Sequence, residues 1–99
     1  MARHDAFPNP EGRGWLLDVQ ADLLRDLNTR VVVPLMPVDI APRPARGLNP
    51  VFRLDGEEHV MVTQFLSAVP AGLVGGRATS LAAEATAISN ALDLLLTGV

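Results

Sequence analysis

The chain has 99 residues, 48% of them hydrophobic, and a mean hydropathy of +0.25, so it is predicted to fold as one domain with an apolar core rather than to be disordered. It contains no cysteine, which excludes disulfides and thiolate metal sites, and no apolar run that is long enough to span a bilayer. The net charge is −3 and the eight basic residues are scattered arginines, which disfavours nucleic-acid binding because that function needs a basic stripe.

The N-terminal region is predicted to contain two short strands. The first covers residues 2–7 and ends before Pro8 and Pro10, which supply no backbone N–H to a sheet. The second covers residues 15–20, with the sequence WLLDVQ. The first ten residues lack the apolar segment of a signal peptide, so a cytoplasmic location is expected.

Residues 21–28 form the next connection. Leu23, Leu24 and Leu27 would share one face of a helix, which indicates a short helical turn. A compact loop fits the same sequence equally well, so both structures remain open.

A buried strand is predicted over residues 30–35, because RVVVPL is dense in β-branched side chains. Pro34 must either end this strand or lie where no neighbouring strand needs its N–H. The proline-rich stretch 37–50 that follows predicts an ordered but irregular loop.

Residues 51–65 carry the clearest hairpin pattern. Asp55 and Gly56 separate VFRL from EEHVMVTQF, and this dipeptide suits the left-handed torsions of a type I′ turn. Residues 67–74 then predict a final short strand or a bend.

A long α-helix is predicted over residues 79–99. Ser80 is its expected N-cap, Glu84 lies near the positive end of its dipole, and Gly98 is its expected stop. Apolar residues at alternating steps of four and three place one stripe on this helix, namely Leu81, Ala85, Ile88, Leu92, Leu95 and Val99. Antiparallel strands followed by one terminal helix indicate an α+β fold or a small barrel with a helix.

The end of this helix has more apolar surface than one core needs. Leu94 and Leu96 lie off the main stripe, so the last turn lacks the polar back face of an ordinary surface helix. Three explanations are open: a helix buried on both sides in a homodimer, a tail packed over its own sheet, or a tail that docks into another protein.

The sequence contains no recognisable catalytic constellation, cofactor motif or metal site. His4 and His59 have no partner at a metal-ligand spacing, and both are predicted to lie on the solvent faces of strands. Asp18, Asp22 and Asp26 recur every four residues and are predicted to form a solvated edge. The residues therefore favour a binding protein over an enzyme.

Several segments resemble the CcdB family of bacterial addiction toxins. They are WLLDVQADLL (15–24), RVVVPL (30–35), TQFLSAVP (63–70) and LLLTGV (94–99), and the resemblance extends over about residues 13–99. The family implies an SH3-like β-barrel with a long C-terminal helix, a two-fold homodimer, and a fold related to that of the MazF ribonucleases. Its members poison the A subunit of DNA gyrase by trapping it on cleaved DNA. They are not enzymes, and a partner antitoxin, CcdA, neutralises them.

The resemblance also implies which residues contact gyrase. Carried onto this chain, the family's contacts fall at Leu23, Leu24, Asp93, Leu96, Thr97, Gly98 and Val99. Two positions depart from the family, because Thr97 replaces an aromatic residue and Asp93 replaces asparagine. Loss of a terminal tryptophan at an interface commonly costs at least ~2 kcal/mol, or roughly thirtyfold in affinity.

Arg43 and Arg46 are the residues expected to meet an acidic antitoxin, and the fold could gather Arg53 into the same basic patch. Two further functions stay open. One is that of a divergent family member that no longer poisons gyrase. The other is that of a MazF-like endoribonuclease, which would need arginines such as Arg30 or Arg53 at an RNA site.

Overall fold

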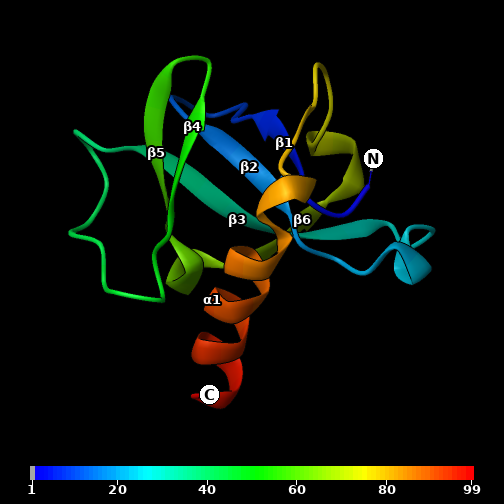
Figure 1. Cartoon of the computed structure of the whole chain (residues 1–99). Coiled ribbons are helices and arrows are strands. Elements are labelled where there is room, and N and C mark those ends of the chain that lie inside the picture. Colours follow the sequence, from blue (N-terminus) through cyan, green and yellow to red (C-terminus); the bar gives the residue numbers. More distant parts are fainter. Residues whose placement is uncertain (1) are drawn as a thin grey trace.

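The computed structural model describes residues 2–99, which form a curled antiparallel sheet and one C-terminal helix (Figure 1). The strands are β1 (Asp5–Pro8), β2 (Trp15–Asp18), β3 (Thr29–Pro37), β4 (Val51–Leu54), β5 (Glu57–Met61), β6 (Ser67–Pro70) and β7 (Thr79–Ser80), and the helix is α1 (Ala85–Thr97). Their order is β4-β5-β3-β2-β1-β7, with β6 beside β3. Short 3-10 turns occur at Asp22–Leu24, Thr63–Phe65, Ala71–Leu73 and Ala82–Glu84. This half-barrel with a terminal helix confirms the predicted fold class.

Strand β3 is the centre of the sheet. One of its edges pairs with β2, whereas the other edge pairs with β6 over Thr29–Val32 and with β5 over Leu35–Pro37. Pro34 lies where the partner changes, and its carbonyl oxygen accepts the Val62 N–H at 3.0 Å. The strand therefore continues through the proline, which is the second of the two predicted possibilities, because no neighbour needs an N–H there.

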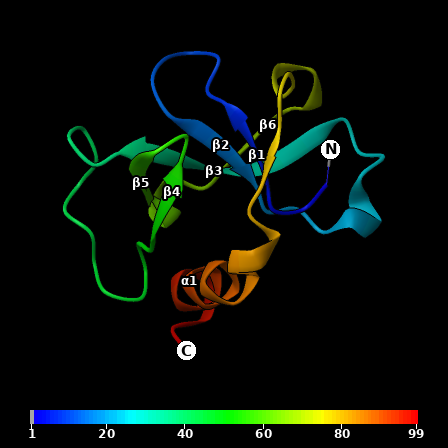
Figure 2. The same ribbon diagram turned by 45° about the horizontal axis from the view of Figure 1, so that its top comes forward.

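The apolar core fills the space between the concave side of the sheet and α1 (Figure 2). From the helix it takes Ile88, Ala91 and Leu92, and from the sheet it takes residues such as Leu17 and Met61. The second half of α1 projects beyond the sheet (Figure 1). The helix therefore packs on the core mainly through its first turns.

The start of the helix was predicted wrongly. It begins at Ala85, because Thr79 and Ser80 form the short strand β7 beside Asp5 and Ala6 of β1 and so cover an open sheet edge. Ser80 is therefore not the N-cap. Its hydroxyl accepts the Ala82 N–H at 3.2 Å and starts a 3-10 turn instead.

The end of the helix matches the prediction more closely. Gly98 ends α1 with φ +78°, and its N–H bonds back to the carbonyl oxygens of Asp93 and Leu94 at 3.1 Å. Val99 lies outside the helix and 89% of it is exposed, so it does not belong to the buried stripe. Ala91 is buried in that stripe instead.

The predicted hairpin is confirmed. Asp55 and Gly56 connect β4 and β5 with φ values of +50° and +76°, as a type I′ turn requires. At the N-terminus, the first strand is shifted toward Asp5–Pro8, because His4 has φ +75° and turns the chain before the strand begins.

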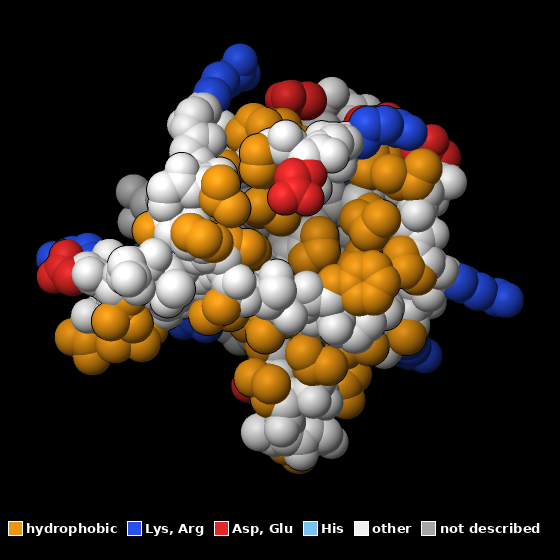
Figure 3. Space-filling view, turned by 180° about the vertical axis from the view of Figure 1, so that it is seen from behind, with side chains coloured by type: hydrophobic (Ala, Val, Ile, Leu, Met, Phe, Trp, Pro, Cys, Tyr) orange, Lys and Arg blue, Asp and Glu red, His pale blue; other side chains and the backbone are white. Residues whose placement is uncertain are grey.

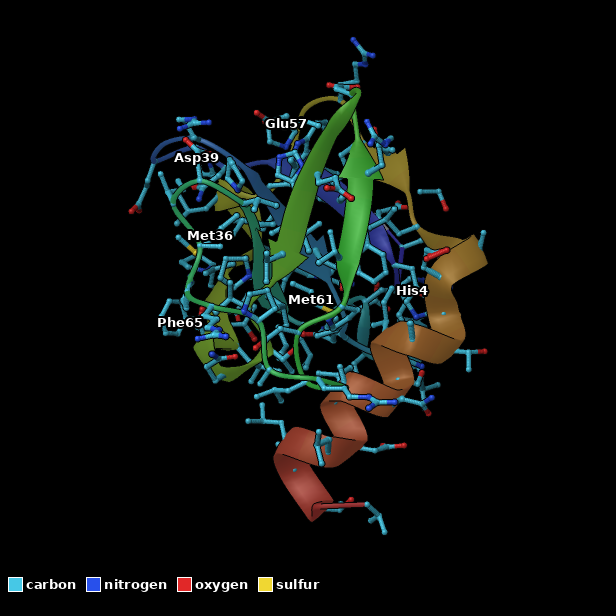
Figure 4. The ribbon with its side chains drawn as sticks, turned by 60° about the vertical axis from the view of Figure 1, so that its left-hand side comes forward. His4, Met36, Asp39, Glu57, Met61 and Phe65 are labelled. Atoms are coloured by element: carbon cyan, nitrogen blue, oxygen red, sulfur yellow. The ribbon has the colours of Figure 1, made fainter. Side chains whose placement is uncertain are left out.

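Three polar residues predicted to be solvated are buried or half-buried. His59 is only 2% exposed on β5, and its Nδ1 lies 2.9 Å from the Glu57 carbonyl oxygen. His4 is half-buried near the entry to α1 (Figure 4), where burial and the adjacent Arg3 charge lower its pKa. Asp18 is completely buried beside Arg30. The solvent-face predictions were therefore wrong for the two histidines, and the solvated-edge prediction was wrong for Asp18.

A prediction concerns Gly14, which has φ +96° at the start of β2. A methyl group there would overlap the Leu35 carbonyl oxygen and lie 3.3 Å from Pro37 Cδ. Gly14→Ala is expected to lower the free energy of unfolding by about 2 kcal/mol, measured by urea denaturation. Gly12→Ala is the control, because no atom lies within 4 Å of the added methyl group. Equal stability of the two variants would contradict the prediction.

Candidate partner-binding site

The tip of α1 carries an exposed apolar surface next to the glycine that ends the helix. Leu96 is 69% exposed and Val99 is 89% exposed, and Leu94 is also exposed. The Thr97 hydroxyl donates to the Asp93 carbonyl oxygen at 2.7 Å, so this side chain folds back on its own helix. The predicted gyrase contacts on the helix therefore lie together at one exposed end that does not contribute to the core. They are Asp93, Leu96, Thr97, Gly98 and Val99.

A second exposed apolar surface lies on the connection 21–28. Its Asp22–Leu24 segment is a 3-10 turn and the rest is an irregular loop, so each of the two open alternatives describes part of the connection. None of these eight residues is buried, and Leu23 is 92% exposed, with Leu24 and Leu27 also exposed. An almost fully exposed leucine beside two others is typical of an interaction surface.

A buried ion pair lies where β2 ends and β3 begins, next to this connection. Arg30 donates through Nε at 2.9 Å and through Nη2 at 2.5 Å to Asp18 Oδ2. The side chains are 2% and 0% exposed, respectively. Burial raises the pKa of Asp18, although the hydrogen bond from Arg30 opposes that rise.

The irregular loop 38–50 lies against the second half of α1. Asn49 anchors it, because its Nδ2 donates to the Met61 carbonyl oxygen at 3.0 Å and its Oδ1 accepts the Ala45 N–H at 2.9 Å. A methyl group added at Gly47 would lie 3.5 Å from Leu94 Cδ2. The prediction of an ordered but irregular loop is therefore confirmed.

Arg43 and Arg46 are both exposed on this loop, close in sequence to the glycine that approaches α1. Arg53 does not join them, because its Nη1 donates to the Gly56 carbonyl oxygen at 2.8 Å at the turn of the hairpin. The possible three-arginine patch is therefore reduced to two residues.

The predicted gyrase contacts are divided between two places on one protomer. Figures 1 and 3 show the 21–28 connection projecting from the side of the sheet, apart from the tip of α1. Leu23 and Leu24 therefore do not adjoin Leu96 and Val99 within a single chain. Simultaneous contact with both surfaces requires either a broad partner or a second copy.

A charged cluster lies at the hairpin end of the sheet, away from these surfaces. Arg13 bonds both carboxylate oxygens of Asp39, at 2.9 and 3.2 Å, and approaches Glu57 at 3.8 Å. The hydrogen bond from Arg13 lowers the pKa of Asp39. Figure 4 shows Asp39 and Glu57 close together at this end. All three side chains are exposed, so this cluster joins surface loops and has the character of a solvated ion-pair network.

An apolar groove of about 230 Å³ crosses the outer face of the sheet, which Figure 3 shows. Leu16 and Pro34 line it between the β1–β2 loop and Leu73. Its lining comes from three distant parts of the chain, residues 9–16, Pro34 and residues 67–73, so no local sequence pattern predicts it.

Within the described residues 2–99, no group of three or more His, Asp or Glu side chains is placed to share a metal ion. Over the same residues, none of the helices has the length and apolar character needed to cross a membrane.

Comparison with protein families gives a match to the CcdB protein family over residues 3–98. The matched region includes both strands of the hairpin, the connection 21–28 and α1 up to Gly98. With nearly the whole chain matched and the sheet and helix arranged as that family implies, this protein belongs to the CcdB family, the toxins of toxin–antitoxin systems.

Proposed function

We propose that this protein is a homodimeric toxin that binds the A subunit of DNA gyrase and traps the enzyme on cleaved DNA. The observation that carries the proposal is the tip of α1, where Leu96 and Val99 are exposed on either side of the Gly98 turn that ends the helix. These apolar side chains add nothing to the core of the protein. Because a helix end presents them to solvent, they are suited to binding a partner.

The mechanism is binding without covalent chemistry. In a two-fold dimer the paired ends of α1 enter a cleft that opens between the gyrase A subunits, and their presence disfavours closure. The two-fold axis of the toxin matches that of the gyrase A dimer, so both tips make equivalent contacts. Leu23 and Leu24 supply a second apolar contact from the 21–28 connection.

A CcdA-like antitoxin silences the toxin by covering this end of the molecule. Arg43 and Arg46 are exposed on the loop that lies against α1, so acidic side chains that pair with them would lie beside the gyrase-binding tip. Bound antitoxin then excludes gyrase by occupying adjoining surface.

The departure at Thr97 gives a prediction. Thr97→Trp restores a large aromatic surface at an exposed helix end and removes only one hydrogen bond within the helix. The variant is expected to bind the A subunit roughly thirtyfold more tightly than the wild-type protein, measured by isothermal titration. Thr97→Ser keeps the hydroxyl and is the matched control. Unchanged affinity of the tryptophan variant would mean that this position lies outside the interface.

The same titration with the wild-type protein tests the proposal itself, provided that the A subunit comes from the host that encodes the toxin. Saturable binding of one toxin dimer per A-subunit dimer is the expected result. A folded dimer without any binding would contradict it.

A second candidate function is that of a CcdB-fold protein that binds an antitoxin but no longer poisons gyrase. Two observations favour it: Thr97 lacks a stacking surface, and Asp93 adds a charge where the family has a neutral amide. A ribonuclease activity has less support, since Arg30 is buried in its pair with Asp18 and is not available to RNA.

A further inference from the structure

The connection 21–28 contributes no residue to the core, so other contacts must help to fix its position. Leu23 is 92% exposed, and Leu24 and Leu27 are 46% and 51% exposed, so the hydrophobic effect holds the connection only in part. Its own backbone bonds fix its local shape only, and they run from Leu24 N–H to the Ala21 oxygen, from Arg25 N–H to the Asp22 oxygen and from Leu27 N–H to the Leu24 oxygen. Its position relative to the sheet therefore depends also on polar contacts outside the connection.

One buried side chain makes the central contact. Gln20 is 6% exposed, and its Nε2 donates to the Leu24 carbonyl oxygen at 2.9 Å. The same amide accepts the Val31 N–H of β3 through Oε1 at 3.0 Å. A single side chain therefore ties the connection to the central strand through both of its polar atoms.

The backbone of Gln20 is fixed as well. Its N–H donates to Asp18 Oδ1 at 3.0 Å, and the other oxygen of Asp18 is held by Arg30. The amide is thus preorganised by the buried ion pair. The remaining ties of the connection are at its ends, from Arg3 N–H to Asp22 Oδ1 at 2.8 Å and from Ala71 N–H to the Asn28 oxygen at 2.9 Å.

We propose that Gln20 is a positioning residue for gyrase binding, which it supports by fixing the Leu24 carbonyl oxygen and so presenting Leu23 and Leu24 in their bound orientation. Gln20 itself does not touch the partner. Because the connection is held in advance, the binding step does not have to order it. The identity of the partner rests on the proposed function, whereas the fixing of the connection by Gln20 does not.

Gln20→Glu tests the proposal, because the carboxylate keeps an acceptor for the Val31 N–H and loses the donor to Leu24. Gln64→Glu is the matched control, since Gln64 accepts a hydrogen bond from Asn49 through Oε1 and is remote from the connection in sequence and contacts. If a carboxylate at the buried position 20 prevents folding, Gln20→Met replaces it with an uncharged side chain of similar length.

Amide hydrogen exchange measures the positioning without any partner. In the wild-type protein the amides of Leu24, Arg25 and Leu27 are expected to be protected, and in the Gln20 variant they are expected to exchange about fivefold to tenfold faster with core amides unchanged. The proposal would be overturned if these amides exchanged in the wild-type protein at the rate of an unfolded chain. It would also be overturned if their exchange rates were the same in the variant as in the wild-type protein.

Binding to the gyrase A subunit supplies the second measurement. Gln20→Glu is expected to weaken binding about tenfold, and this effect should vanish when Leu23 and Leu24 are both replaced by alanine. If Gln20→Glu lowered the affinity for gyrase equally with and without the two leucines, the positioning role would be overturned. If the wild-type protein does not bind gyrase at all, the proposed function fails, while the exchange measurement still decides the role of Gln20.

Discussion

Arg30→Met is expected to lower the free energy of unfolding by about 3–5 kcal/mol, because it leaves the buried Asp18 carboxylate without its partner. The pair is enclosed at the junction of β2 and β3, with side chains 0% and 2% exposed, so water cannot replace the guanidinium. Urea denaturation at neutral pH measures the loss. Arg53→Met, on an exposed part of β4, is the control and is expected to change stability by less than about 0.5 kcal/mol.

The pH dependence of this loss identifies its cause. Burial already raises the pKa of Asp18 above 3.8, and removal of Arg30 takes away the hydrogen bond that opposes the rise. A raised folded-state pKa means that the folded protein binds this proton more tightly than the unfolded chain does. The deficit of Arg30→Met relative to the wild-type protein should therefore be greatest above that raised pKa and shrink as the pH falls toward 3.8.

The double variant Asp18→Asn/Arg30→Met completes the experiment. It retains an acceptor for the Gln20 N–H and leaves no unpaired charge, so it is expected to be more stable than Arg30→Met alone. A double variant that is less stable than the single one, or a deficit that does not change with pH, would mean that packing rather than charge dominates at this position.

Deletion of Thr97–Val99 is expected to abolish the proposed gyrase poisoning and leave the proposed dimer folded. The three residues are exposed, and their hydrogen bonds are confined to the last turn of α1, where they reach Asp93 and Leu94. Their removal should cost less than about 1 kcal/mol, as expected for the loss of a few solvent-exposed hydrogen bonds at a helix end. Sedimentation and thermal unfolding measure the dimer and its stability, and growth inhibition measures the toxicity.

The outcome separates a binding role from a structural one. A truncated protein that unfolds or becomes monomeric would show that the tip stabilises the fold. A truncated dimer that still inhibits growth would place the gyrase contacts elsewhere, for example on the 21–28 connection.

The parts of the fold that could be predicted from the sequence are those with local causes. The Asp55–Gly56 turn and the Gly98 helix end depend on the torsions of one or two residues, and both were predicted correctly. The exposed tip was also foreseeable, since Leu94 and Leu96 exceed what one buried stripe can use.

The parts that could not be predicted depend on residues far apart in the chain. The change of partner along β3 and the capture of Thr79 and Ser80 by β1 need the whole sheet. His59, Val60 and Met61 are consecutive and all buried at the end of β5, so the alternation of an ordinary strand could not predict that His59 is buried. The Gln20 contacts depend on side-chain positions that no spacing specifies.

The most direct test of gyrase poisoning is a DNA cleavage assay with the host's own gyrase, in the presence and absence of the purified toxin. Stabilised double-strand breaks are the predicted result, and they would also show that Thr97, Gly98 and Val99 suffice without a terminal aromatic residue. No breaks from a folded dimer, under conditions where a known gyrase poison produces them, would contradict the proposed mechanism and favour the family member that only binds its antitoxin.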